Sequence, residues 1–116
     1  MPLHVATHPL ITHKMTLLRD VKTSANDFRK VLREISFYLG YEASRDLKLG
    51  QDLIRTPMNM DFEGSKIAEN IAIIPILRAG LAMADGMLEL MPKAAVYHIG
   101  EIGSTFQSCP EFDVFF

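Results

Sequence analysis

The sequence predicts an α/β fold, and three stretches between residues 71 and 99 carry that prediction. The isoleucine-rich apolar run of residues 71–77 has the length and composition of a buried parallel strand. A helical pattern follows over residues 82–91, and a second apolar stretch follows over residues 94–99. Strand, helix and strand in this order form a βαβ unit, in which the crossover is almost always right-handed.

Two elements are expected before this unit. Residues 1–22 are predicted to be an extended arm, because Pro2 and Pro9 interrupt any regular pattern. A helix is predicted from about residue 25 to 44, since Ser24 with Asp27 three residues later is typical of a helix start. Apolar residues then recur at helical spacing, namely Phe28, Val31, Leu32, Ile35 and Leu39. Gly40 weakens the second half of this helix.

The segment between the long helix and the first strand is irregular. Residues 47–70 contain many turn formers, and Thr56-Pro57 disfavours helix, so only a weak hairpin signal remains. The helix over residues 82–91 is closed by Pro92. Its methionines, Met83, Met87 and Met91, are expected to face the core.

Composition restricts the class of protein. The chain has 116 residues, of which 48% are hydrophobic and 22% charged, as in one small globular domain. With 12 basic and 14 acidic residues the net charge is −2, which gives no support for a nucleic-acid-binding surface. The single Cys109 cannot form an internal disulfide, and no apolar run is long enough to cross a bilayer. Since no signal peptide is recognisable either, we expect a cytoplasmic protein without membrane contact.

Arg78 is the leading candidate for a functional residue. It ends the first predicted strand, and ligands of α/β folds bind at the carboxyl ends of strands. Its planar guanidinium suits a phosphate or diphosphate, with backbone N–H groups of the following turn beside it. Gly80 would let the backbone approach that ligand closely. The alternative is an arginine paired with a surface acid, and neither a dinucleotide-binding nor a P-loop motif is present.

The remaining chemically active side chains form no recognised motif. His8 and His13 are five residues apart, which is not a metal-ligand spacing, so no metal ligands are predicted. His98 lies near a strand end and is interpreted as a partly buried, hydrogen-bonded residue. Cys109 has no histidine nearby that would support a catalytic thiol.

Four segments, in collinear order, resemble the N-terminal half of uracil phosphoribosyltransferases, over about residues 8–100. They are His8-Pro9-Leu10-Ile11-Thr12-His13-Lys14-Met15-Thr16-Leu17-Leu18-Arg19-Asp20, Tyr41-Glu42-Ala43-Ser44-Arg45-Asp46-Leu47, Pro75-Ile76-Leu77-Arg78-Ala79-Gly80-Leu81 and Asp85-Gly86-Met87-Leu88-Glu89-Leu90. The resemblance implies a type I phosphoribosyltransferase fold, which is Rossmann-like. It also implies Mg²⁺-assisted transfer of the phosphoribosyl group from phosphoribosyl diphosphate (PRPP) to uracil, giving UMP and diphosphate.

The resemblance also implies roles for particular residues. Arg78, Ala79 and Gly80 match the loop that binds the diphosphate of PRPP, and no catalytic residue is assigned. The N-terminal arm matches the one that the family uses in subunit association, so a homo-oligomer is implied for an intact member.

Beyond Gly100 the sequence departs from the family pattern. Gly103 stands where the family has a second PRPP-binding arginine, and no acidic Thr/Gly-rich loop for the 5-phosphate follows. The segment that reads the uracil edge is also missing, and residues 101–116 form a divergent Phe-rich tail. We therefore expect residues 1–100 to form an incomplete phosphoribosyltransferase domain, as an inactive fragment. The alternative is a non-catalytic dimerisation module that pairs with a full-length homologue through the arm and the helix over residues 25–44; a non-functional gene remnant is a third possibility.

Overall fold

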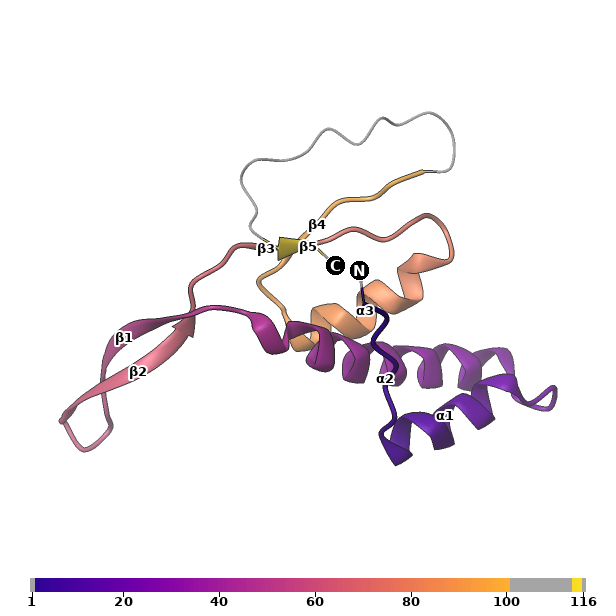
Figure 1. Ribbon diagram of the computed structural model, residues 1–116, viewed down its shortest axis with the longest axis horizontal. Helices are drawn as coiled ribbons and strands as arrows, with labels where there is room; N and C mark the ends of the chain where they lie inside the picture. Colours follow the sequence, from indigo (N-terminus) through magenta and orange to yellow (C-terminus); the bar gives the residue numbers. More distant parts are fainter. Residues whose placement is uncertain (1, 101–113, 116) are drawn as a thin grey trace.

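The computed structural model describes residues 2–100 and the backbone of residues 114 and 115. Within these residues three α-helices lie beside a three-stranded sheet, and a β-hairpin that forms a second, two-stranded sheet projects from them (Figure 1). This mixed architecture confirms the predicted fold class. The predicted tail, residues 101–116, lies outside the described residues except for the short strand β5 (Val114–Phe115).

Helix α1 (Pro9–Arg19) corrects the prediction of an extended arm. Pro9 occupies the first helical position, where its missing N–H costs nothing and its fixed φ favours the helix. The side chain of His8 caps the helix, because its Nδ1 accepts a hydrogen bond from the Leu10 N–H at 3.2 Å. A proline that the sequence analysis took for an interruption is therefore the start of the helix.

Helix α2 (Ala25–Ala43) confirms the predicted long helix to within one residue. The Ser24 Oγ accepts a hydrogen bond from the Asp27 N–H at 3.1 Å and lies 2.8 Å from the Asp27 carboxylate. Helix α1 packs against α2, with Ile11 buried and an ion pair between Lys14 and Glu34.

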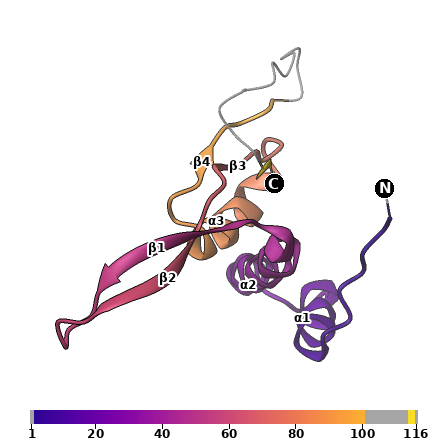
Figure 2. The ribbon, with the colours of Figure 1, turned by 60° about the vertical axis from the view of Figure 1, so that its left-hand side comes forward.

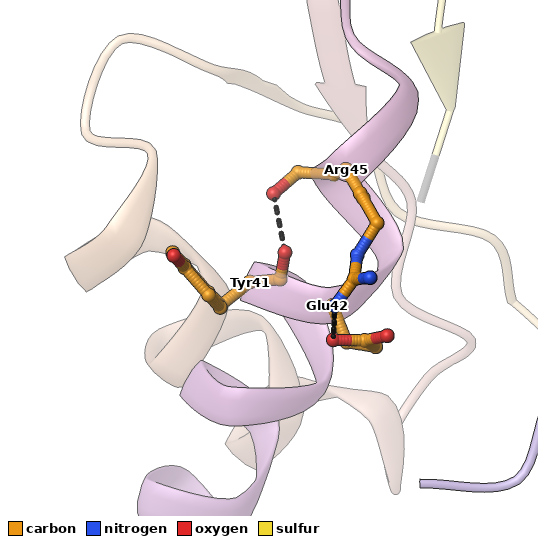
Figure 3. A network of polar contacts seen from close by, with 4 residues as sticks. Tyr41, Glu42 and Arg45 are labelled. Atoms are coloured by element: carbon orange, nitrogen blue, oxygen red, sulfur yellow. Dashed lines mark hydrogen bonds and ion pairs between the residues drawn. The ribbon is translucent and has the colours of Figure 1, made fainter.

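The end of α2 leads into a single 3₁₀ turn, η1 (Ser44–Asp46). The Ser44 hydroxyl donates a hydrogen bond to the Tyr41 carbonyl at 3.0 Å. Arg45 donates to the Glu42 carboxylate at 2.8 Å, and Figure 3 shows these two side chains turned toward each other. Because the Arg45–Glu42 pair is exposed, it contributes at most about 1 kcal/mol. The polar contacts at the end of α2 thus belong to the surface.

A β-hairpin follows, formed by β1 (Leu49–Arg55) and β2 (Asp61–Ile67). The strands are antiparallel, and their register runs from Leu49 opposite Ile67 to Arg55 opposite Asp61. The hairpin stands away from the helices in both ribbon views (Figures 1 and 2). Apolar side chains on it are therefore left exposed, among them Leu53, Ile54 and Phe62.

The predicted βαβ unit is present, with shorter strands than expected. Strand β3 (Ile71–Ile73) pairs in parallel with β4 (Ala95–Val96) after helix α3 (Gly80–Leu90), and β5 pairs in parallel with the other edge of β3. Pairing resumes only at the bridge between Ile76 and Ile99. Pro75 explains the interruption. The Tyr97 N–H donates to the Ile73 carbonyl and the Ile99 N–H donates to the Pro75 carbonyl, and a continuous ladder would need residue 75 to donate an N–H between these two bonds. Proline has no N–H to donate.

Helices α2 and α3 cross closely because small residues lie at their contact. Ser36 is fully buried, and a Cβ built on Gly86 would lie 2.3 Å from the Arg33 carbonyl oxygen. Gly40, which weakened the helix prediction, has the same role against Leu90 and Met87. Among the methionines of α3 and its end, Met91 is buried at 7% exposure, whereas Met83 is 39% exposed, so the expectation that Met83 faces the core is wrong.

Candidate functional site

The residues predicted to bind diphosphate lie in the connection between β3 and α3. Arg78 and Ala79 are the last two residues before α3, and Gly80 is the first residue of the helix. The segment comes after the carboxyl end of β3, where ligands of α/β folds bind. The structure therefore places all three predicted residues together, at the end of the sheet.

Main-chain hydrogen bonds hold this connection against the chain that follows β4. The Leu77 N–H donates to the Ile99 carbonyl at 2.8 Å, and the Ile99 N–H donates to the Pro75 carbonyl at 3.2 Å. The Gly80 N–H donates to the Ile76 carbonyl at 2.8 Å, which closes the turn that carries Arg78. The peptide bond between Leu77 and Arg78 is cis. The three main-chain hydrogen bonds thus hold the backbone on both sides of Arg78.

Gly80 meets a packing requirement that its sequence did not reveal. A Cβ at this position would lie 3.0 Å from the Pro75 Cβ and 3.1 Å from its Cα. A side chain here would press the start of α3 away from the end of β3. The close approach of this backbone to a ligand stays a prediction.

Arg78 is exposed, and no acid in the described part of the chain pairs with it. The alternative of an arginine paired with a surface acid therefore finds no support within residues 2–100. Within the same residues the Ala79 N–H has no hydrogen-bond partner, and α3 has no side-chain cap. A cation and an N–H donor lie next to each other in the chain, a combination suited to an anion.

The other residues considered from the sequence are placed as follows. His98 is exposed and precedes Ile99, the residue that pairs with the Arg78 connection, so its predicted partial burial is wrong. His8 caps α1, and His13 is exposed. Throughout the described residues no three or more His, Cys, Asp or Glu side chains gather as metal ligands would. Cys109 and Gly103 lie outside these residues.

One feature escaped the sequence analysis, a groove between the first half of α2 and the start of α3. Its volume is about 350 Å³, and its lining residues are Asn26, Arg29, Lys30, Arg33, Ala82 and Asp85. The four residues of α2 follow the spacing i, i+3, i+4 and i+7, so they share one helical face. That spacing was visible in the sequence, but nothing there showed that α3 lies opposite.

Comparison with known proteins identifies the family of this chain. The family model for uracil phosphoribosyltransferase matches residues 5–110. The chain belongs to the uracil phosphoribosyltransferase family. The match extends ten residues past Gly100, where the resemblance was predicted to stop.

Individual relatives agree with the family model. The chain is 50% identical over 96 residues to uracil phosphoribosyltransferase from Alkaliphilus oremlandii and 48% identical to the enzyme from Streptococcus pyogenes serotype M5. The alignment covers 83% of this chain and 46% of each relative, so the chain spans about half the length of these relatives. Among solved structures, the AQ2163 protein from Aquifex aeolicus is similar with a TM-score of 0.77 at 38% identity, over 84% of this chain and 47% of that one.

No helix within the described residues combines the length and the apolar character needed to cross a membrane.

Proposed function

We propose that this chain carries the diphosphate-binding part of a uracil phosphoribosyltransferase, which converts uracil and PRPP to UMP and diphosphate. The observation that carries the proposal is the exposed Arg78 at the carboxyl end of β3, without an acidic partner among residues 2–100, in a chain of this family. Arg78, Ala79 and Gly80 are the proposed diphosphate ligands.

The chemistry of the reaction explains why an arginine is useful there. The departing diphosphate gains negative charge as its bond to the ribose breaks, and fixed donors lower the barrier by stabilising that charge. The guanidinium of Arg78 can offer two parallel N–H donors to phosphate oxygens. The Ala79 N–H would add a neutral donor at the same end of the ligand.

Mg²⁺ enters the proposal only through PRPP. The described residues bring together no three carboxylates, histidines or cysteines that would hold the ion. Phosphate oxygens of PRPP would be among its ligands, and the ion would neutralise part of the charge on the diphosphate when bound. The roles given above to Arg78 and Ala79 do not depend on it.

We propose further that the 116-residue chain has little or no turnover by itself. It spans about half of its relatives, and the family's acidic Thr/Gly-rich loop and uracil-reading segment are not found in its sequence. Arg78 alone would leave the 5-phosphate unheld, so PRPP should bind weakly and Arg78→Ala should change that weak affinity by less than about twofold.

A chimera gives a sharper test of the role of Arg78. Residues 1–100 are joined to the C-terminal half of the Alkaliphilus oremlandii enzyme, and UMP formation from labelled uracil is measured. Arg78→Ala is expected to reduce kcat/KM by about a hundredfold, with partial recovery for Arg78→Lys. Lys93→Ala, which removes another exposed cation without an ion pair among residues 2–100, is the control. Equal activity of the Arg78→Ala chimera and its parent would reject the assignment.

A second candidate is a dimerisation module that pairs with a full-length homologue. It is favoured by the intact packing of α1 on α2 and by the exposed apolar side chains of α1 and of the hairpin. Co-expression with a tagged full-length relative would capture the chain if this candidate is correct. The absence of a complex in sedimentation velocity at micromolar concentrations of both proteins would reject it. Sedimentation of the chain alone would show whether it forms a homo-oligomer.

A further inference from the structure

The groove between α2 and α3 brings several cations to one place. Arg29, Lys30 and Arg33 lie along one wall, on neighbouring turns of α2, and Asp85 of α3 lies on the other wall. Ala82, the third residue of α3, is small and leaves the space between the helices open. The groove thus carries three positive charges and one negative charge.

Most of this positive charge is not neutralised within the described structure. Arg33 has a partner, since its Nε lies 3.3 Å from a carboxylate oxygen of Glu89. Neither Arg29 nor Lys30 forms an ion pair with any acid in residues 2–100. Arg33 lies four residues after Arg29 and three after Lys30, and like charges at these helical spacings repel each other. A bound anion would remove that repulsion, and the exposed guanidinium and ammonium groups are free to turn toward it.

We propose that this groove binds the phosphate group of a small phosphorylated compound that also carries a hydroxyl. The phosphate would lie against Arg29 and Lys30, with Arg33 and the Asn26 amide within the same groove. Asp85 repels a bare phosphate but accepts a hydrogen bond from a hydroxyl, so it favours a phosphate ester over inorganic phosphate. The volume of about 350 Å³ is at the lower end of the range for small-molecule sites.

This site is separate from the proposed diphosphate site. Arg78, Ala79 and Gly80 do not line the groove. The proposal therefore does not depend on the proposed activity, and each can fail without the other.

The test is an amide NMR titration of the whole chain at constant ionic strength, with inorganic phosphate and with glycerol 3-phosphate as probes. For the wild type, shifts are expected at residues 26–33 and 82–85, with glycerol 3-phosphate binding more tightly than inorganic phosphate. Arg29→Gln/Lys30→Gln should weaken both probes about tenfold or more, because two charge-assisted contacts are lost. The matched control is Lys22→Gln/Arg55→Gln, which removes two exposed cations that also lack ion pairs within the described residues. It should change neither affinity by more than about twofold.

Asp85→Asn distinguishes a built site from a diffuse positive surface. It should strengthen the binding of inorganic phosphate, since a repelling charge is removed, and reduce the preference for glycerol 3-phosphate. Arg78→Gln should leave both titrations unchanged. The proposal is overturned if the wild type shows no saturable shifts in the groove, if the control pair weakens binding as much as the groove pair, or if Arg78→Gln abolishes the shifts. Unchanged probe preference in Asp85→Asn would overturn the assigned role of Asp85.

Discussion

Replacing Gly86 by alanine tests the close crossing of α2 and α3, and Gly40 provides a matched control. Both glycines lie inside helices and face the partner helix. At Gly86 an added Cβ would lie 2.3 Å from the Arg33 carbonyl oxygen and 2.9 Å from the Ser36 Cβ. At Gly40 the nearest atom is a Leu90 methyl carbon at 3.3 Å. The first obstacle belongs to the backbone, and the second is the end of a flexible side chain.

The two substitutions are therefore expected to have effects of opposite sign. Alanine in place of glycine within a helix gains about 1 kcal/mol in either case. Forcing an extra carbon into a packed contact costs typically about 1–3 kcal/mol, and Gly86 belongs at the upper end because α2 itself must move. The net expectation for Gly86→Ala is a loss of about 2 kcal/mol in the free energy of unfolding. For Gly40→Ala, where Leu90 needs to shift by only a few tenths of an ångström, the expectation is a gain of about 0.5 kcal/mol.

Urea unfolding followed by far-ultraviolet circular dichroism measures this difference. The slope of the unfolding free energy with urea should stay the same in all three proteins, so that the midpoints report stability directly. The melting temperature of Gly86→Ala should fall by about 8–16 °C, since 1 kcal/mol corresponds to roughly 4–8 °C in a domain of this size. If Gly86→Ala were as stable as the wild type, or if both variants lost equally, the close crossing would not exist as described.

Substitutions at three further positions test local features. Ser24→Ala removes the side-chain acceptor for the Asp27 N–H and should lower the unfolding free energy by about 1 kcal/mol, which the same urea experiment measures. Glu34→Gln breaks the partly buried pair with Lys14 and should cost about 0.5–1 kcal/mol in low salt. That cost should shrink in 1 M NaCl, and an unchanged cost would argue against an electrostatic origin. Asn59 has a positive φ of 62° in the hairpin turn, so Asn59→Gly should preserve hydrogen-exchange protection of the hairpin amides, whereas Asn59→Val should reduce it.

The sequence was sufficient to predict helix α2 and the order of the βαβ unit. Helix α2 was predicted to within one residue, because its cap at Ser24 and its apolar stripe depend only on residues close together in the chain. The order of β3, α3 and β4, and the place of Arg78 after the first strand, were predicted for the same reason. Strand lengths were overestimated, since the apolar run does not show that the ladder needs an N–H at position 75, where proline has none.

The sequence was not sufficient to predict helix α1. Pro9 is compatible with a turn and with a helix start, and the choice depends on the His8 cap and on packing against α2 through Ile11. An ion pair with Glu34, twenty residues along the chain from Lys14, also ties this helix in place. The last two contacts reach beyond residue 22, so the pattern of residues 1–22 cannot show them.

By itself the sequence determined the α/β class, the long helix, the βαβ order and the place of Arg78 after the first strand, because these features depend on neighbouring residues or on collinear motifs. Only the tertiary structure decided why Gly40, Gly80 and Gly86 have no side chain, and that the basic face of α2 lines a groove. The physical reason is that close packing and opposing charges act between residues dozens of positions apart, and their effect depends on distances of a few ångströms that local patterns do not encode.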